Sequence, residues 1–179
     1  KGDGDDVIDV GFGVLRALSK FHESLQTQEE QRAANKDRSN IRFAVGDVVY
    51  HKKFEFRGVV AGWHHRPVLD VSKWNGVVDL PSGKEQPFYY IIPDIYDIKQ
   101  AEPRSHNSDF RYCAQENLES LSSSPEFCRI VNGAVAREFE EFLPTEGKFL
   151  PSERLRYQYP MDWTGGRSDG DGGEHDGPI

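Results

Sequence analysis

The chain has 179 residues, of which 36% are hydrophobic and 29% are charged, and its formal net charge is −8. A chain of this size and composition predicts one modest core, which fits a single domain with flanking elements. The sequence has no apolar run of about 18 residues, so it predicts no transmembrane helix, and its two cysteines are too few for a disulfide framework or a structural zinc site.

The two cysteines, Cys113 and Cys128, are expected to be reduced and partly buried. They predict an intracellular, reducing compartment, which could be an organelle such as a plastid, or otherwise the cytosol or the nucleus. The chain begins with Lys1 and not with Met, so we expect a processed chain or a part of a longer one.

Residues 1–40 predict an N-terminal amphipathic helix. Its apolar stripe recurs at steps of three and four residues and consists of Ile8, Phe12, Leu15, Leu18, Phe21 and Leu25. After Leu25 the sequence keeps good helix formers but loses the stripe. We therefore expect the first half of this helix to dock and its second half to project into solvent.

Residues 41–121 change to a period of two and predict a β-domain. The expected strands are Val48 to His51, "FRGVVAGWHH", "PFYYIIPD" and the start of "FRYCAQENL", which should end in a short turn or helix. Two long loops, Arg66 to Gln86 and Pro93 to Asp109, separate these strands. Short strands with glycine kinks predict an α+β, mainly β chain built on a small, closed, antiparallel barrel.

Residues 122–144 predict a C-terminal helix, with Ser124 as its N-cap and Pro144 as its end. Residues 145–179 form an aromatic arm, "KFLPSERLRYQYPMDW", and an acidic, glycine-rich tail with the composition of disorder. The arm could wrap its own barrel or lie across another subunit. We favour the second, because aromatic, Met and Arg side chains are common anchors of protein interfaces.

Four ordered motifs resemble a known family. The segments "FAVGDVVYHKKFEFRGVVAGWHHRP", a loop with Trp74, "EQPFYYIIPD" and "FRYCAQENLESL" are similar to the YccV-like domain, also called the hemimethylated-DNA-binding or HspQ-type domain. The resemblance covers a little under half of the chain. It implies a small SH3-like β-barrel without enzymatic activity, as in adaptors of Clp-type proteases, in some F-box proteins and in a bacterial protein first described as binding hemimethylated DNA.

Basic and aromatic side chains interleave along residues 51–66, where a hairpin would bring them to one edge of the barrel. Such a mixture suits single-stranded nucleic acid or an acidic peptide. A tryptophan in a loop, like Trp74, either covers the end of a barrel or meets a partner. The candidate partner-binding residues are Lys52, Lys53, Phe54, Phe56, Arg57, Trp63, His64, His65, Arg66, Trp74, Tyr157, Tyr159 and Trp163.

The paired histidines His64 and His65 do not predict a metal site. Neighbouring residues on a strand point to opposite faces, and no Cys, Asp or Glu lies two positions away. The sequence also lacks a nucleophile elbow, a phosphate-binding loop and an H-E-x-x-H motif. We expect no cofactor, no metal and no catalytic residue.

The sequence therefore predicts a non-enzymatic protein-interaction module, acting as an adaptor or an accessory subunit of a larger complex. The alternative is binding of hemimethylated DNA or another nucleic acid. A continuous basic face including Lys52, Lys53, Arg57 and Arg66 would favour the alternative, because phosphate neutralisation supplies most of the affinity for nucleic acid. Carboxylates that interrupt this face would count against it.

Overall fold

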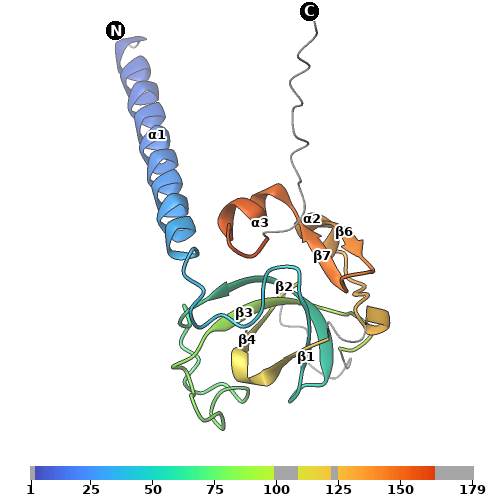
Figure 1. Ribbon diagram of the computed structural model, residues 1–179. Coiled ribbons are helices and arrows are strands. Elements are labelled where there is room, and N and C mark those ends of the chain that lie inside the picture. The colour runs from blue at the N-terminus through green and yellow to red at the C-terminus, as the bar shows by residue number, and fades with distance from the viewer. Residues whose placement is uncertain (1–2, 99–108, 122–124, 164–179) are drawn as a thin grey trace, which may run out of the picture.

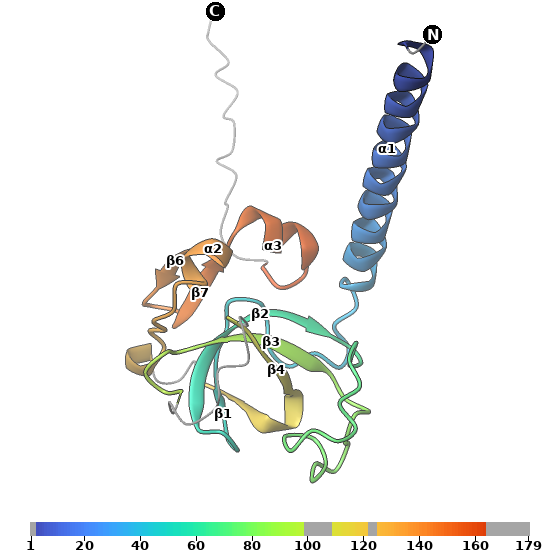
Figure 2. The same ribbon diagram turned by 180° about the vertical axis from the view of Figure 1, so that it is seen from behind.

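The computed structural model describes residues 3–98, 109–121 and 125–163. A long helix, α1 (Asp3–Ala34), rises from a β-rich body, and the C-terminal elements cover one side of that body (Figures 1 and 2). Within the part of the chain described, no helix is long and apolar enough to span a membrane.

The body is built on one antiparallel sheet of five strands in the order β4-β3-β2-β1-β5. The sequence predicted the positions of the first four strands closely, and a short 3-10 helix, η1 (Gln115–Asn117), follows β4 as expected. The strands are β1 (Val48–His51), β2 (Phe56–His64), β3 (Phe88–Pro93), β4 (Arg111–Ala114) and β5 (Leu118–Ser120).

The sheet is open. Its two edge strands, β4 and β5, follow each other in sequence, but no ladder joins them among the described residues. Strand β2 is irregular between Val60 and Gly62, close to one of the expected glycine kinks. The α+β, mainly β class is thus confirmed, whereas closure into an SH3-like barrel is not seen.

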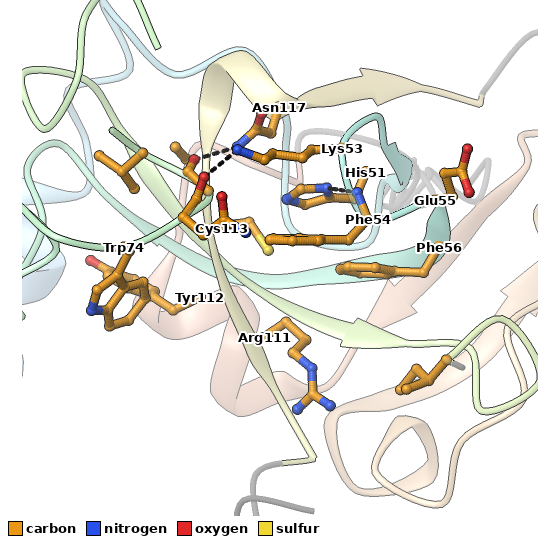
Figure 3. Close-up of a pocket in the computed structure, with 15 residues that line it drawn as sticks. His51, Lys53, Phe54, Glu55, Phe56, Trp74, Arg111, Tyr112, Cys113 and Asn117 are labelled. Carbon is orange, nitrogen blue, oxygen red and sulfur yellow. Dashed lines mark hydrogen bonds between the residues drawn. The ribbon is translucent and has the colours of Figure 1, made fainter. Parts of the chain in front are cut away.

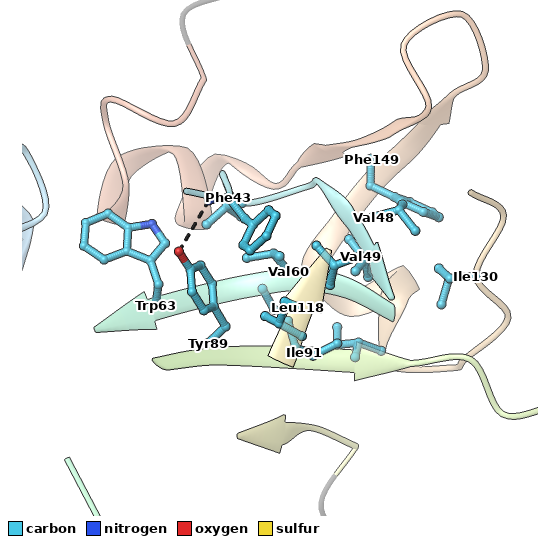
Figure 4. Packing of buried hydrophobic residues seen from close by; sticks show 14 of the residues in the cluster. Phe43, Val48, Val49, Val60, Trp63, Tyr89, Ile91, Leu118, Ile130 and Phe149 are labelled. Carbon is cyan, nitrogen blue, oxygen red and sulfur yellow. Dashed lines mark hydrogen bonds between the residues drawn. The ribbon is translucent and has the colours of Figure 1, made fainter. Parts of the chain in front are cut away.

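Buried side chains from β1, β2 and β3 form the main core, together with residues from the C-terminal elements (Figure 4). Trp63 and Tyr89 are fully buried at one end of this core, and Phe149 reaches it from the C-terminal side. The Tyr89 hydroxyl accepts the backbone N–H of Arg42 at 3.1 Å and donates to Gln115 at 2.6 Å, so its polar end is satisfied. Each such large side chain contributes about 1.5–3 kcal/mol by its burial.

The prediction of one helix over 122–144 is wrong. The described part holds a 3-10 turn η2 (Pro125–Phe127), one short helix α2 (Val135–Glu138) and then a strand, β6 (Phe139–Leu143), which pairs with β7 (Lys148–Pro151). The reason is tertiary packing. Phe149 lies 4.9 Å from the ring of Phe142 and 5.7 Å from that of Phe139, which a continued helix would not allow.

The β6-β7 hairpin is fixed to the main sheet next to β1. The backbone N–H of Phe149 donates to the carbonyl of Gly46 at 2.9 Å, and Lys148 forms an ion pair with Asp47. Gly46 has φ +95°, and a Cβ there would lie 2.2 Å from the carbonyl oxygen of Phe149. Only glycine fits this crossing, because it tolerates positive φ and leaves room for the second backbone.

The aromatic arm lies on its own sheet and not in an extended form. It contains β7 and the helix α3 (Glu153–Gln158), and Leu155 and Tyr159 are buried in the core. The expectation that the arm lies across another subunit is therefore wrong for its buried part, and the open alternative, wrapping of its own body, holds. The tail, residues 164–179, lies outside the described residues.

Helix α1 contacts the rest of the protein through its C-terminal end, whereas the sequence predicted docking through its first half. Leu15, Leu18 and Phe21, which belong to the stripe expected to dock, are 58–63% exposed. Its last turns instead contact α3: the Arg32 guanidinium lies 4.4 Å from the ring centre of Tyr157. The side chains of the stripe from Leu15 to Leu25 therefore face solvent, and the helix is held by polar and cation–π contacts at its end.

Candidate functional site

The turn between β1 and β2 is organised by His51. The backbone N–H of Phe54 donates to His51 Nδ1 at 3.1 Å, and that of Glu55 donates to the carbonyl of His51 at 2.8 Å. Glu55 takes φ +53°, which closes the turn. His51 thus acts as a cap for a turn that points Phe54 outward.

His51 lies between two aromatic rings. Its ring centre is 4.8 Å from that of Phe54 and 5.0 Å from that of Phe56, and both pairs are stacked. Burial, aided by the nearby charges of Lys52 and Lys53, lowers the pKa of His51 to about 4. The imidazole is therefore neutral near pH 7, which keeps Nδ1 available as an acceptor.

A second element of the site, the loop containing Trp74, is tied to this turn. Asn117 Nδ2 donates to the carbonyl of Gly76 at 2.6 Å, and the carbonyl of Asn117 accepts the backbone N–H of Lys52 at 2.8 Å. The ammonium group of Lys53 donates to the carbonyl of Asn75. A buried asparagine thus joins the loop and the hairpin across the end of the sheet.

These elements enclose an aromatic pocket with a volume of about 490 Å³ (Figure 3). This volume falls within the range of ligand-binding pockets. Phe54 and Trp74 stand at its mouth and are 43% and 38% exposed. We define the aromatic pocket by its lining residues, which include His51, Lys53, Phe54, Glu55, Phe56, Trp74, Asn75, Gly76, Val77, Ile98, Asn117 and all four residues of β4.

Strand β4 supplies one wall of the aromatic pocket. The ring of Tyr112 contacts that of Trp74 edge-on at 6.2 Å, and its hydroxyl accepts the backbone N–H of Val68 at 3.2 Å. Burial raises the pKa of Tyr112 and of Cys113 to about 12 each, so both stay neutral at physiological pH. The wall therefore offers packing surface and no activated nucleophile.

Four of the predicted partner-binding residues meet in the aromatic pocket: Lys53, Phe54, Phe56 and Trp74. Lys52 lies beside it on the turn and is exposed. The sequence signal for Lys53, Phe54 and Phe56 was the interleaving of cations and aromatics, and the signal for Trp74 was a tryptophan in a loop. His51 lay in the interleaved region but was not named as a partner-binding residue. The sequence carries no signal for Tyr112, Asn117 and Arg111, whose strands or turns approach only when the sheet forms.

The predicted basic face is interrupted by carboxylates. Arg57 forms a two-point contact with Asp97, with Nε to Oδ2 at 2.7 Å and Nη2 to Oδ1 at 3.0 Å. Arg66 pairs with Glu85 at 2.7 Å, and Lys53 pairs with Asp79 at 3.2 Å. Three of the four cations named for a DNA-binding face are thus partnered within the chain.

The remaining predicted residues lie away from the aromatic pocket. Trp63 is fully buried and Tyr159 is buried against it, with ring centres 5.2 Å apart. Tyr157 contacts α1, and Trp163 is half-buried near the end of the described chain. None of these side chains forms one surface with Trp74.

The two adjacent histidines contact different neighbours, and only His64 belongs to β2, since the strand ends there and His65 follows in a bend. His64 Nδ1 lies 3.3 Å from the Tyr112 hydroxyl, whereas His65 lies edge-on to Trp63 at 5.2 Å. Among the described residues, no group of three or more His, Cys, Asp or Glu side chains is placed to hold a metal ion.

Comparison with known proteins identifies the family. A family model described as "Hemimethylated DNA-binding protein YccV like" matches residues 41–145, more than half of the chain, so the chain belongs to the YccV-like family. No curated protein and no solved structure matches the chain. The family's description agrees with the DNA-binding alternative better than with the adaptor prediction.

Proposed function

We propose that this member of the YccV-like family is a non-enzymatic protein-interaction module, and that its aromatic pocket accepts a large apolar side chain of a partner protein. The observation that carries the proposal is the pair of exposed aromatic rings, Phe54 and Trp74, held at the mouth of a preformed pocket. Exposed aromatic side chains on a rigid support are typical of interface hot spots.

The hydrogen bonds around the aromatic pocket favour this function. The cap on the Phe54 turn and the tie from Asn117 to Gly76 hold both rings in place before a ligand arrives. Little conformational entropy is then lost on binding. A fully buried apolar side chain of the partner would contribute about 1.5–3 kcal/mol. We place this module in a reducing compartment, in keeping with its two buried cysteines, which form no disulfide.

Binding of hemimethylated DNA is the second candidate, and family membership favours it. The internal pairing of Arg57, Arg66 and Lys53 argues against tight binding to duplex DNA, because carboxylates interrupt the basic face that contacts with phosphates need. Affinity for duplex DNA that falls by orders of magnitude between about 50 and about 200 mM salt would support this candidate.

One experiment compares the two candidates. Short random peptides displayed on phage are selected on the immobilised chain, and the recovered peptide is titrated by calorimetry against the wild type, Phe54→Ala and Phe21→Ala. Both variants remove an exposed phenylalanine, but Phe21 belongs to α1, and no described residue of α1 lines the aromatic pocket. We expect Phe54→Ala to weaken binding about tenfold or more and Phe21→Ala to leave it unchanged.

The same preparations are titrated with a hemimethylated duplex and with its unmethylated form at low and physiological salt. If no peptide is recovered while the hemimethylated duplex binds tightly and selectively at physiological salt, the peptide proposal is wrong and the DNA candidate replaces it.

A further inference from the structure

His51 has a polar atom that the fold does not use. Its side chain is buried, with the residue only 2% exposed, and it lines the aromatic pocket. Nδ1 accepts the backbone N–H of Phe54 at 3.1 Å, whereas Nε2 bonds to no group within the described part of the chain. Nε2 is also not among the unpaired nitrogen and oxygen atoms that are closed off from solvent. Figure 3 shows it on the side of the ring turned away from the Phe54 amide, so it is reached from the pocket.

The bond to Phe54 determines which nitrogen of His51 carries the proton. A neutral imidazole has one N–H donor and one acceptor nitrogen. Burial keeps the imidazole neutral near pH 7, with a pKa lowered to about 4, and Nδ1 is the acceptor. The proton is therefore on Nε2, which offers an N–H donor to the aromatic pocket. Because His51 is stacked between the rings of Phe54 and Phe56, this donor has a fixed direction.

The donor limits which side chains can fill the aromatic pocket. A side chain that displaces water from the Nε2–H must itself supply an acceptor, because a buried donor without a partner is costly. The exposed rings of Phe54 and Trp74 favour an aromatic body beside them. Among the aromatic side chains, phenylalanine has no acceptor and tryptophan only donates, whereas the hydroxyl oxygen of tyrosine accepts. A carboxylate would accept too, but burying its charge against aromatic rings costs far more.

We propose that the aromatic pocket is specific for a tyrosine side chain of the partner protein, whose hydroxyl oxygen accepts the Nε2–H of His51. This inference rests on the proposed function, because it specifies which large side chain enters the pocket. Phe54 and Trp74 bind the ring, and His51 recognises its polar end. His51 is thus the residue that determines specificity, since a site built to bond a hydroxyl discriminates strongly against the analogue that lacks it.

The phage-selected peptides test the class of side chain. We expect every peptide that is weakened by Phe54→Ala to contain a tyrosine at one shared position. Replacing this tyrosine by phenylalanine removes only the hydroxyl group and leaves the Nε2–H of His51 buried without an acceptor. The affinity measured by calorimetry should therefore fall about tenfold or more.

His51→Asn is the matched variant of the chain. The amide oxygen of an asparagine takes over the acceptor role of Nδ1 towards the Phe54 N–H, as in other side-chain caps, but the shorter side chain has no donor where Nε2 lies. The tyrosine and phenylalanine peptides should bind this variant with affinities within about twofold of each other. If the difference of about tenfold persists in His51→Asn, another group recognises the hydroxyl and the role of His51 is wrong.

The tautomer of His51 can be measured without any substitution. Proton–nitrogen NMR spectra of the imidazole should show a protonated Nε2 and an unprotonated Nδ1 in the free chain at neutral pH. Binding of the tyrosine peptide should slow the exchange of the Nε2 proton with solvent. A proton found on Nδ1 in the free chain overturns the inference before any peptide is added.

The outcomes separate the two proposals. Peptides that are weakened by Phe54→Ala but insert leucine, methionine or phenylalanine overturn the tyrosine specificity and leave the proposed function in place. Equal affinities of the tyrosine and phenylalanine peptides for the wild type have the same meaning. If no peptide binds, the proposed function fails and the tyrosine specificity fails with it.

Discussion

Two aromatic clusters of this chain contain a tryptophan from the matched family region, and they differ in what covers them. Trp74 is 38% exposed at the mouth of the aromatic pocket, whereas Trp63 is fully buried. The chain itself covers Trp63: the ring of Tyr159 packs on it at 5.2 Å, and Asp162 accepts its indole N–H at 2.8 Å. The C-terminal segment thus occupies one aromatic surface of the sheet and leaves the other open.

The covered cluster shows how this body holds a segment of its own chain. A tyrosine supplies packing, a carboxylate accepts an indole N–H and a backbone N–H, and Gly62 leaves room for the Tyr159 hydroxyl. Substitutions in the two clusters should then act differently, on stability in one and on binding in the other.

The largest effect is expected for Asp162→Ala, which removes the carboxylate that bonds to Trp63. The carboxylate accepts from Trp63 Nε1 and from the Val45 N–H, and it pairs with Arg38 at 2.9 Å. Its loss leaves buried donors without a partner, and we expect the free energy of unfolding to fall by about 3 kcal/mol. Thermal unfolding should show a midpoint lower by about 6–12 °C.

Asp79→Ala is the matched control for Asp162→Ala. Asp79 also pairs with one cation, Lys53, but its side chain is 78% exposed, so its loss should cost less than about 0.5 kcal/mol. Equal effects of the two substitutions would show that the C-terminal segment is not held by Asp162.

The next largest effect is expected when the pH is lowered, and it comes from His51 in the aromatic pocket. The pKa of His51 is lowered by burial to about 4 in the folded chain, against 6.5 when unfolded. Between these values the unfolded chain binds a proton that the folded chain does not. The contribution of His51 to the free energy of unfolding is therefore fully present above pH 6.5 and is lost as the pH falls towards 4. We expect urea unfolding to show a loss of about 2 kcal/mol between about pH 7 and about pH 4.5.

The comparison with His51→Gln isolates this effect, since the other titrating groups are shared. The variant should lose about 2 kcal/mol less than the wild type over the same pH range. Parallel pH profiles for the two proteins would mean that His51 is not the buried neutral group of the turn.

The sequence was a good guide to elements whose pattern is local. The alternating runs around Val59 and Ile91 predicted β2 and β3, and the "YCAQEN" segment predicted a strand followed by a turn. The failures concern elements decided by distant contacts. Residues 125–143 have a helical stripe, yet Cys128 and Ile130 enter the main core from a loop and Phe139 packs on β7.

Only part of the candidate site could be predicted from the sequence. Interleaved cations and aromatics pointed to Lys53, Phe54 and Phe56, and the placement of a tryptophan in a loop pointed to Trp74. Tyr112 and Asn117 could not be found in this way, because their contribution depends on the register of β4 and on a single hydrogen bond to Gly76. The ion pairs that neutralise the basic face likewise join residues far apart in sequence.

Asn117→Ala should have an intermediate effect on the free energy of unfolding. It should also weaken binding at the aromatic pocket. The buried amide of Asn117 donates to the Gly76 carbonyl, which holds the Trp74 loop near the hairpin. We expect a loss of about 1–2 kcal/mol in urea unfolding. Peptide affinity should fall although every aromatic ring remains, because the pocket is less preorganised. Unchanged affinity would show that the loop keeps its place without this bond.

The smallest effect is expected on helix α1, outside both clusters. Leu18 and Phe21 are 58% and 63% exposed, so replacing either by alanine removes little buried surface. We expect each variant to unfold within about 0.5 kcal/mol of the wild type. Tyr157→Ala, which removes the ring under Arg32, should instead loosen the end of α1 and cost about 1 kcal/mol. If the alanine variants in the stripe were the more damaging ones, the first half of α1 would dock on the body after all, as its sequence pattern suggested.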